Sequence, residues 1–493
     1  MKMKDIRNAY RQALPAGELR MFREDEIDRV HIPVVAASLV LPDGSQFGTH
    51  GYGLTQEEAE VSALGEMTEF VYSELVLRTL PRVQGTYEEL VRERGVRAVA
   101  DPLTMCLQAG SDYHPGMPLT WVEVTRLTTG EKVLVPEEWV ATSPSLLEGR
   151  TSHLITPITN GQGAGLSREQ AVAHGLLELM QRDGNGLQFR ALDQGVVLDL
   201  KGAPLNEDIQ ELLAHYEGLG IEIMAKLAST DFGFVNVYVV GRDPSPGKQP
   251  LVLSSCGEAA DPDRDRALRK ALIEYASSRT RKAFANGPLD EVERVAPPGY
   301  LQDFLSHVKL ESEEKRALHA MAWFAQLPTA EMRALMERTV LTERRRVPFT
   351  QLPTAPEVTD TRRRYDTLVE RISQAGLDIL VADLSPEDPA SHSVKVIVPG
   401  MEVETMSYHR IGERGVAKLL AREDPLAGLG KPPEGAARVR LTAEAEARLG
   451  GPAWFNRKLA DQRLGNLYAL YREPERHAAQ LLLRQRRFGG GLS

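Results

Sequence analysis

The chain has 493 residues, of which 42% are hydrophobic and 26% charged, and its formal net charge is −10. This composition is typical of a globular protein with several domains or one large α/β unit, and the acidic balance argues against a protein that coats nucleic acid. With only Cys106 and Cys256, neither a disulfide framework nor a cysteine-rich zinc site is expected. The sequence has no apolar signal segment and no apolar run of the roughly 20 residues that cross a bilayer. We therefore expect a cytoplasmic protein with no membrane partner.

Residues 1–29 are predicted to form a polar arm with a short helical pattern. A buried strand is predicted over residues 30–41, and a turn leads into a second strand that ends near Tyr52. A helix over residues 55–77 follows, because Thr55 and the glutamate three residues later make a capping box. The first unit of the chain is therefore strand, strand, helix.

The helix over 55–77 carries a polar stripe of Ser62, Glu66 and Glu69, at offsets that align side chains along one face. Two carboxylates on adjacent turns repel one another unless a positive charge lies between them, and a divalent cation is one candidate. A solvated acidic face is the alternative for this helix taken alone.

A glycine-rich segment, NGQGAGL at 160–166, is predicted to be a flexible loop that opens a second helix. Ser167 is a suitable N-cap, with Gln170 completing a capping box. The N–H groups of such a loop can hold a phosphate, although the segment is neither a P-loop nor a dinucleotide fingerprint, and a turn without a ligand is the alternative. The helix carries a second polar stripe, formed by Gln170, His174, Glu178 and Gln181.

Further strand patterns precede a third helix. A hairpin is predicted within residues 120–136, another joins 221–228 to 234–241, and a short strand covers 251–255. The third helix is expected to begin after Asp261, with a proline at its first position. Its polar stripe is formed by Lys270, Glu274 and Ser277. Three such stripes favour a shared polar cleft, because helices that pack on one sheet can direct them to one place.

The rest of the chain is predicted to be mostly helical. Residues 286–360 indicate a helical insertion with a break at 344–346, and two late strands are expected within 376–384 and 393–401. Residues 406–493 are predicted to form a polar helical extension.

Together these segments resemble the YcaO family of ATP-dependent enzymes that modify peptide backbones, over about residues 30–405. In that family a Gly-Lys-Gly segment precedes a helix reading Ser-x3-Glu-x2-Glu-Arg, and here GYG at 51–53 precedes the stripe that starts at Ser62. The second family element is an Asn-Gly-rich loop and a helix ending Glu-x2-Glu-Arg, which matches NGQGAGL and the helix ending at Arg182. The third is Gly-Ala-His-x-Asp, then Arg-x3-Glu-x2-Gln, which matches GEAADPD and the stripe that starts at Lys270.

The resemblance implies an α/β fold in which helices flank β-sheets around a nucleotide cleft, with the helical insertion inside the domain and the helical extension after it. It also implies ATP and Mg²⁺ as cofactors. The metal ligands that it implies are Glu66, Glu69, Glu178 and Gln181. The nucleotide contacts that it implies are Ser62, Gln170, Arg182, Lys270 and Glu274. No catalytic residue is assigned.

The family resemblance implies an enzyme that uses ATP to activate a backbone amide of a ribosomally synthesised precursor peptide in natural-product biosynthesis. The product would be an azoline, an amidine or a thioamide, or the amide would be cleaved. The expected partners are the precursor peptide, a separate leader-recognising protein and a second copy of the chain, with no nucleic acid.

Seven positions depart from the family pattern and keep a second function open, that of a non-catalytic scaffold that binds a peptide or a partner. Gln181 replaces a metal-binding glutamate and offers an oxygen without charge, and Lys270 replaces an arginine and lacks its bidentate fork. The seven departures are Tyr52, Phe70, Leu166, Gln170, Gln181, Lys270 and Ser277.

Overall fold

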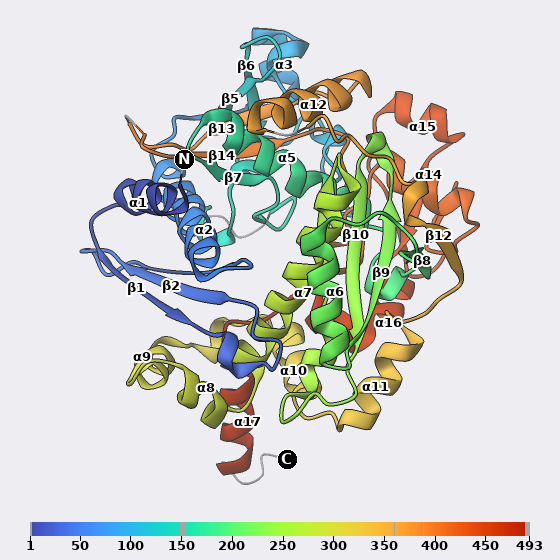
Figure 1. The fold of residues 1–493 in the computed structure, drawn as a ribbon. Coiled ribbons are helices and arrows are strands. Elements are labelled where there is room, and N and C mark those ends of the chain that lie inside the picture. The colour runs from blue at the N-terminus through green and yellow to red at the C-terminus, as the bar shows by residue number, and fades with distance from the viewer. Residues whose placement is uncertain (1, 148–152, 359, 388, 489–493) are drawn as a thin grey trace.

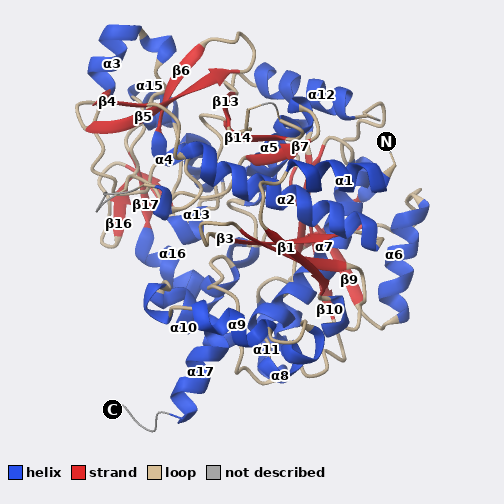
Figure 2. Ribbon diagram, turned by 90° about the vertical axis from the view of Figure 1, so that its left-hand side faces the viewer, coloured by secondary structure: helices blue, strands red, loops and turns tan. Residues whose placement is uncertain are grey.

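The computed structural model of the protein describes residues 2–147, 153–358, 360–387 and 389–488. In these residues the strands form four sheets, and helices lie between and around them (Figures 1 and 2). The predicted α/β fold with sheets flanked by helices is confirmed. None of the helices in these ranges is long and apolar enough to cross a membrane.

The N-terminal unit is an antiparallel sheet in the order β1-β2-β3, with two helices on one face (Figure 1). Its elements are α1 (Met3–Ala13), β1 (Glu18–Arg23), β2 (Val34–Val40), β3 (Gln46–Tyr52) and α2 (Gln56–Leu77). The strand, strand, helix order is confirmed. The arm expected before residue 30 also contains the edge strand β1, which was not predicted. All residues of β1 are exposed or half-buried, so its sequence has no apolar run that would indicate a strand.

Helix α2 lies directly on the strand that precedes it. A Cβ added to Gly51 of β3 would lie 2.0 Å from the backbone nitrogen of Ala63, so only glycine permits this approach. The predicted capping box between Thr55 and Glu58 is present. The apolar face is fully buried at Ala59, Ala63, Met67 and Val71.

The second sheet has the order β4-β5-β13-β14-β7, with β6 paired to β5. Its strands are β4 (Arg82–Thr86), β5 (Pro118–Arg126), β6 (Lys132–Pro136), β7 (Gln162–Gly165), β13 (Leu380–Asp383) and β14 (His392–Ile397). The predicted β5–β6 hairpin and the two late strands are confirmed. The helices of this region are α3 (Tyr87–Arg94), α4 (Glu137–Val140), α5 (Arg168–Asn185) and α12 (Thr361–Gln374).

The glycine-rich segment was predicted to be a flexible loop, and this is wrong for residues 162–165. These residues form the buried strand β7, which pairs with β14. The glycines are needed for packing, because a Cβ on Gly163 would lie 2.1 Å from the carbonyl oxygen of Ala171 in α5. The small residues of the sequence GQGAG therefore indicate the close packing of β7 against α5 and not a loop.

The third sheet has the order β11-β10-β9-β8-β12, and α6 and α7 cover one face (Figure 1). Its elements are β8 (Val196–Asp199), α6 (Glu207–Gly218), β9 (Glu222–Ser229), β10 (Val235–Arg242), β11 (Gly257–Asp261), α7 (Arg264–Asn286) and β12 (Arg345–Pro348). The β9–β10 hairpin is confirmed. Gly257 repeats the close contact of the other two units, because its Cβ would lie 2.0 Å from the carbonyl oxygen of Ala271.

Two local predictions in this region are wrong, and a third is correct but incomplete. Residues 251–255 are not a strand, because Pro250–Ser254 form a 3-10 helix and the strand begins at Gly257. Helix α7 is capped by Asp263 and not by Asp261, because the Asp263 carboxylate accepts hydrogen bonds from the N–H groups of the first turn. The expected break at 344–346 contains the start of β12, which pairs in parallel with β8.

The helices of the insertion lie in the lower half of the molecule in Figure 1, and the extension runs from α14 and α15 at the upper right to α17 at the bottom. The insertion contains α8 (Leu289–Val295), α9 (Tyr300–His307), α10 (Lys315–Phe324) and α11 (Thr329–Arg338). The extension contains α13 (Thr405–Tyr408), α14 (Glu413–Ala421), α15 (Ala443–Leu449), α16 (Arg457–Leu464) and α17 (Ala478–Phe488). It also contains a small sheet, which the helical prediction omitted, formed by β15 (Ala427–Leu429), β16 (Ala436–Arg438) and β17 (Ala453–Asn456).

His477 is expected to make the stability of the protein fall on acidification. It is 0% exposed among the rings of Phe284, Tyr300 and Phe304, and burial, together with the charge of Arg476, lowers its pKa to about 4. In the unfolded chain the His477 side chain binds a proton below pH 6.5, whereas in the folded protein it remains neutral down to about pH 4. The cost should grow to about 3 kcal/mol over this interval.

The measurement is the free energy of unfolding of wild type and His477→Asn between pH 4 and pH 7. Asparagine removes the titration and tolerates the positive φ of 60° at this position. The variant should show a flatter pH dependence, whatever its absolute stability. Equal slopes for the two proteins would contradict the assignment.

Candidate functional site

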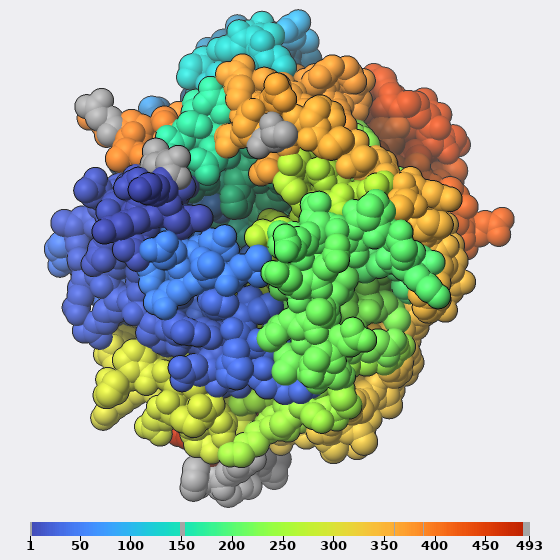
Figure 3. Space-filling view, in the orientation of Figure 1, coloured from blue at the N-terminus to red at the C-terminus, as the bar shows by residue number. Residues whose placement is uncertain are grey.

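The polar faces of α2, α5 and α7 meet where the first, second and third sheets adjoin. Figure 3 shows a hollow there, between the blue N-terminal unit and the teal and green residues of the other two sheets. The Gln162 side chain of β7 donates a 2.6 Å hydrogen bond to the Ser73 hydroxyl of α2, which joins two of the units. The shared cleft expected from the three stripes is therefore present.

Acids from α2 and α5 lie close enough to raise one another's pKa. Burial raises the pKa of Glu69 well above its usual range, and repulsion by Glu178 and Glu66 raises it further. Burial also raises the pKa of Glu66, against the opposing charge of Arg281. The pKa of Glu178 is raised in the same way, against the charge of Arg182. A group of acids in this state is stabilised by a cation placed between them.

Glu274 brings the acid of α7 into the same cleft. Its carboxylate accepts hydrogen bonds from the backbone N–H of Glu258 at 2.6 Å and from the Tyr52 hydroxyl at 3.2 Å. Burial raises the pKa of Glu274, and the charge of Lys270 opposes the shift. Glu178 is held similarly, by a 2.9 Å hydrogen bond from the N–H of Gly161. Backbone N–H groups in the segments that pack against α5 and α7 thus hold the carboxylates of Glu178 and Glu274 in place.

Arg182 and Glu258 form a polar centre at the end of α5. Arg182 lies 3.9 Å from Glu178 and 3.5 Å from Glu258. Asn185 donates a 2.6 Å hydrogen bond to Glu258, and Gln181 lies 3.4 Å from it. The sequence patterns did not find Glu258, because it stands on strand β11 and belongs to no helical stripe. An acid inside a buried strand was its only signal.

His174 of α5 and Lys270 of α7 stand on the second turns of their helices. His174 is exposed at its surface, but partial desolvation and, after it, the charge of Lys270 lower its pKa to about 4. Gln170 is exposed, and its side chain accepts a 3.0 Å hydrogen bond from the N–H of Leu166. The predicted capping box is therefore only half correct, since the Ser167 hydroxyl does accept from the N–H of Gln170.

The remaining stripe positions differ in accessibility. Ser62 is half-buried on α2, and Gln181 is only 6% exposed. Ser277 is fully buried, so the prediction that it lines the polar face of α7 is wrong. Ser277 shares a face with Lys270 and Arg281, which are both exposed, so its burial is local to that turn of α7. Phe70, at the arginine position of the family pattern, is 37% exposed.

Two cations of the site were not predicted. Arg281 on α7 is exposed and lies near enough to Glu66, Glu473 and Glu274 for their charges to raise its pKa. Lys395 on β14 is 2% exposed and donates to the carbonyl oxygen of Ile158. Burial lowers its pKa to about 7, although Glu178 and Glu69 oppose the shift. Arg281 continues the α7 stripe by one more turn, at i+11 from Lys270, and was overlooked, whereas Lys395 lies in no sequence pattern and reaches the site only through contacts between distant segments.

The donor set was compared with the requirements of Mg²⁺. Carboxylates with raised pKa values supply hard oxygen ligands and unbalanced negative charge. Across the described ranges, no three His, Cys, Asp or Glu side chains are close enough to hold a metal ion by themselves. Mg²⁺ commonly takes only one or two carboxylates and completes its shell with phosphate and water. The residues therefore suit an ion shared with a phosphorylated ligand.

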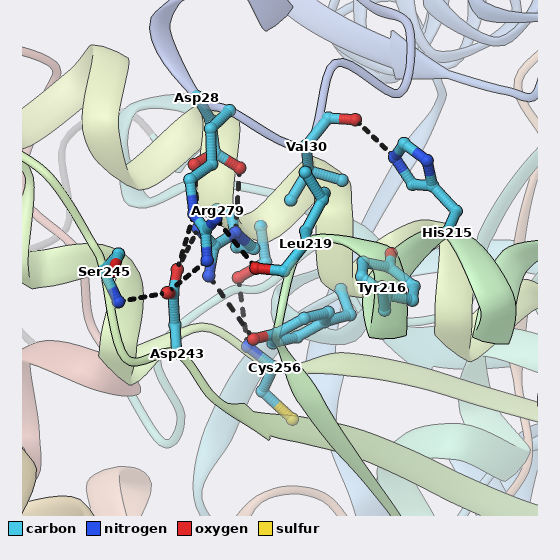
Figure 4. A network of polar contacts seen from close by, with 12 residues as sticks. Asp28, Val30, His215, Tyr216, Leu219, Asp243, Ser245, Cys256 and Arg279 are labelled. Atoms are coloured by element: carbon cyan, nitrogen blue, oxygen red, sulfur yellow. Dashed lines mark hydrogen bonds and ion pairs between the residues drawn. The ribbon is translucent and has the colours of Figure 1, made fainter.

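A buried ion-pair network holds α7 in place (Figure 4). The Arg279 guanidinium lies 2.8 Å from Asp28 of the N-terminal segment and 2.8 Å from Asp243 after β10. Arg29 also pairs with Asp243, at 2.6 Å. The side chains of Arg279 and Asp243 are 0% exposed. The helix that carries Glu274 is thereby fixed to both neighbouring units.

The fold and the cleft define a class of α/β protein with an acid-lined site suited to a nucleotide and its magnesium. A family model described as YcaO cyclodehydratase, ATP- and Mg²⁺-binding, matches residues 50–402, more than half of the chain. The protein therefore belongs to the YcaO family. Members of this family are ATP-dependent enzymes, and ATP and Mg²⁺ are their cofactors.

Two relatives match most of the chain. An uncharacterized protein of Methanothermobacter thermautotrophicus is 26% identical over 404 residues, which cover 81% of this chain and 93% of the relative. An uncharacterized protein in the tfuA 3′ region of Rhizobium leguminosarum bv. trifolii is 23% identical over 407 residues, covering 80% of this chain and 87% of the relative.

Solved structures support the fold. YcaO from Methanopyrus kandleri, bound with AMPPCP and Mg²⁺, has a TM-score of 0.54 and 22% identity, covering 82% of this chain and 90% of that chain. A heterocyclase in complex with substrate and cofactor has a TM-score of 0.57 and 19% identity, covering 82% of this chain. The match spans only 53% of the heterocyclase chain.

Proposed function

We propose that the protein uses ATP and Mg²⁺ to activate a backbone amide of a ribosomally synthesised precursor peptide. The observation that carries this proposal is the convergence of Glu66, Glu69 and Glu178 with raised pKa values in one cleft. A purely structural role gives no reason for three acids from two helices to face one another.

In this proposal Glu66, Glu69, Glu178 and the neutral Gln181 would contribute oxygen ligands to magnesium ions whose remaining ligands are phosphate and water, since no three acids of the described residues could hold one ion by themselves. Magnesium, when bound, supplies positive charge to the phosphates. Arg182 and Lys270, at opposite ends of the stripes, would orient the phosphates by charge, because phosphoryl transfer depends on positioning and electrostatics. The other proposed nucleotide contacts are Ser62, Gln170 and Glu274.

The family's description as a cyclodehydratase favours addition of a nucleophile to the amide carbon and transfer of the γ-phosphoryl group of ATP to the resulting oxygen, which releases ADP; the phosphorylated oxygen then leaves as inorganic phosphate. A side-chain nucleophile would give an azoline, an amine an amidine, sulfide a thioamide, and water would cleave the amide. We further propose a precursor peptide and a separate leader-recognising protein as partners, with self-association into a dimer.

A second candidate is a non-catalytic scaffold that binds a peptide or a partner. Two observations favour it. Gln181 is 6% exposed and its amide group faces Glu258, and Ser277 is fully buried. Both positions belong to the nucleotide site in the family pattern. Here the Gln181 side chain is hydrogen-bonded to Glu258, and the Ser277 side chain is not accessible to solvent.

Calorimetry with ATP separates the two candidates. The enzyme is expected to bind ATP in the presence of Mg²⁺ and at least tenfold more weakly when EDTA is added, because the acids then repel the phosphates. Phosphate release in the presence of a precursor peptide would complete the case. A protein that gives no binding heat with ATP and Mg²⁺, while remaining folded, would support the scaffold.

A further inference from the structure

Arg190 lies near Glu258, because the charges of both residues act on Cys256. It begins the 3-10 turn Arg190–Leu192, which follows α5, and its φ is +49°. A non-glycine residue in this region is strained and commonly belongs to a functional site. The charges of Arg190 and Glu258 both act on the pKa of Tyr471, a residue of the C-terminal extension, so the three lie together.

The Arg190 guanidinium is buried without a polar partner. The residue is 9% exposed, and its Nε and Nη1 atoms have no hydrogen-bond partner among the residues that the structure describes. Its central carbon lies 4.6 Å from the Phe189 ring and 5.4 Å from the Tyr471 ring. Leaving buried N–H groups unpaired is costly, so such groups commonly mark a place for a ligand or water.

The aromatic wall beside Arg190 is fixed before any ligand arrives. The Tyr471 hydroxyl accepts a 2.9 Å hydrogen bond from the N–H of Ala191 and donates one of 2.9 Å to the carbonyl oxygen of Phe189. The ring of Phe189 also packs edge-on against Tyr238, with centroids 5.5 Å apart. A guanidinium packed against rings can still offer the edge of its plane, where its N–H groups form a fork.

Within the described ranges, the acids whose charges act on Arg190 form no ion pair with it, because they are engaged elsewhere. Glu404 accepts hydrogen bonds from the N–H groups of Met406 and Ser407, and Glu473 pairs with Lys282 at 2.9 Å. These engaged carboxylates instead make the surroundings unfavourable for a doubly charged phosphate. A singly charged, planar group with two oxygens is the better match for the fork of an arginine.

Other polar atoms around Glu258 also lack partners within the described ranges. They are the Nε atom of Arg182, the Oδ1 atom of Asn185 and the hydroxyl of Ser255. Arg182 and Asn185 both contact Glu258 through their other nitrogen atoms. A polar ligand near Glu258 would meet both donors and acceptors.

We propose that Arg190 is the anchor of a carboxylate subsite for the peptide substrate. The carboxylate is either the C-terminus of the peptide or an Asp or Glu side chain. This inference rests on the proposed function, because it places the peptide near Glu258, next to the nucleotide. Tyr471 acts as a positioning residue that holds the turn carrying Arg190.

The test uses three model peptides and the full-length protein with saturating AMPPCP and Mg²⁺. They are N-acetyl-triglycine, its C-terminal amide, and N-acetyl-Gly-Asp-Gly amide, and inorganic phosphate is titrated beside them. Binding is followed by ligand-observed NMR. Wild type should bind at least one of the two acids at least tenfold more tightly than the neutral amide, and the preferred acid identifies the source of the carboxylate.

Arg190→Gln should abolish this preference, and Arg190→Lys should keep part of it, because lysine retains the charge and loses the fork. Arg316→Gln is the matched control, since Arg316 also packs on a ring, 4.0 Å from that of Tyr468, but already pairs with Asp461. Tyr471→Phe removes both hydrogen bonds of the hydroxyl and should weaken acid binding about threefold, roughly the value of one hydrogen bond.

Equal binding of the acid and amide peptides by wild type overturns the inference, whether or not the variants fold. Phosphate binding that is lost in Arg190→Gln also overturns it, because Arg190 would then serve the nucleotide. Glu178→Ala separates the two proposals: it should lose AMPPCP and keep the acid preference. A wild-type protein that binds acids and no nucleotide would instead refute only the proposed function.

Discussion

Replacing Glu66 by alanine is expected to abolish ATP-dependent modification of the precursor peptide. Burial raises the pKa of Glu66, and the charges of Arg281 and Glu178 act on it in opposite directions. The variant removes one proposed magnesium ligand and leaves Arg281 with only Glu473 and Glu274 to balance its charge. Loss of one such electrostatic contact commonly lowers the rate about 10²-fold to 10³-fold. Mass spectrometry of the peptide and release of phosphate measure the loss.

The matched control is Glu57→Ala, which removes an exposed acid from the first turn of the same helix. It should change the rate by less than twofold. Glu66→Ala should also lose the dependence of ATP affinity on Mg²⁺, and this readout requires no peptide. Wild-type product formation by Glu66→Ala would falsify the proposed metal ligand.

Replacing Arg279 by methionine is expected to destabilise the protein by about 3–5 kcal/mol. Methionine fills a similar volume but leaves the buried carboxylates of Asp28 and Asp243 without their shared partner. Removing one member of a buried ion pair has this magnitude, because an uncompensated charge remains inside the protein. Chemical denaturation followed by circular dichroism provides the measurement.

Arg269→Met is the control on the same helix. Arg269 pairs with Asp208 near the surface, and both side chains are about one-third exposed (35% and 36%). Breaking such a pair costs at most about 1 kcal/mol. In the Arg279→Met background, Asp28→Asn and Asp243→Asn should restore part of the lost stability, because the stranded charges are removed. A loss below about 1 kcal/mol for Arg279→Met would contradict the role given to this network.

Local sequence patterns predicted most of the fold because the elements obey local rules. The capping box at Thr55 and the periodic apolar face of α2 are both present. The failures have tertiary causes. Strand β1 has no apolar run, and β7 contains glycines because a helix lies against it. Strand β12 lies inside the helical insertion, and its partner β8 is more than 140 residues earlier in the chain.

The candidate site was predictable where it follows helical spacing. Glu66, Glu69, Glu178 and Glu274 are at the cleft, as the stripes and the family resemblance implied. Ser277 obeys the same spacing but is buried, because a 7-residue step on a packed helix does not guarantee one environment. Arg281 extends the α7 stripe by one turn and could have been predicted from it, whereas Glu258 and Lys395 come from strands of two different sheets. Only the fold brings such residues together.

The junction between the first two sheets carries a consequence for motion. Glu66 and Glu69 belong to α2, which packs closely on the first sheet, and Glu178 belongs to α5, which packs closely on the second sheet. Electrostatic repulsion between these acids therefore pushes the two sheets apart. A cation that neutralises these charges would let the two layers draw together. Cation binding and closer packing of the first two sheets would then occur together. Without a cation, the largest fluctuations would be expected at the boundary between these sheets.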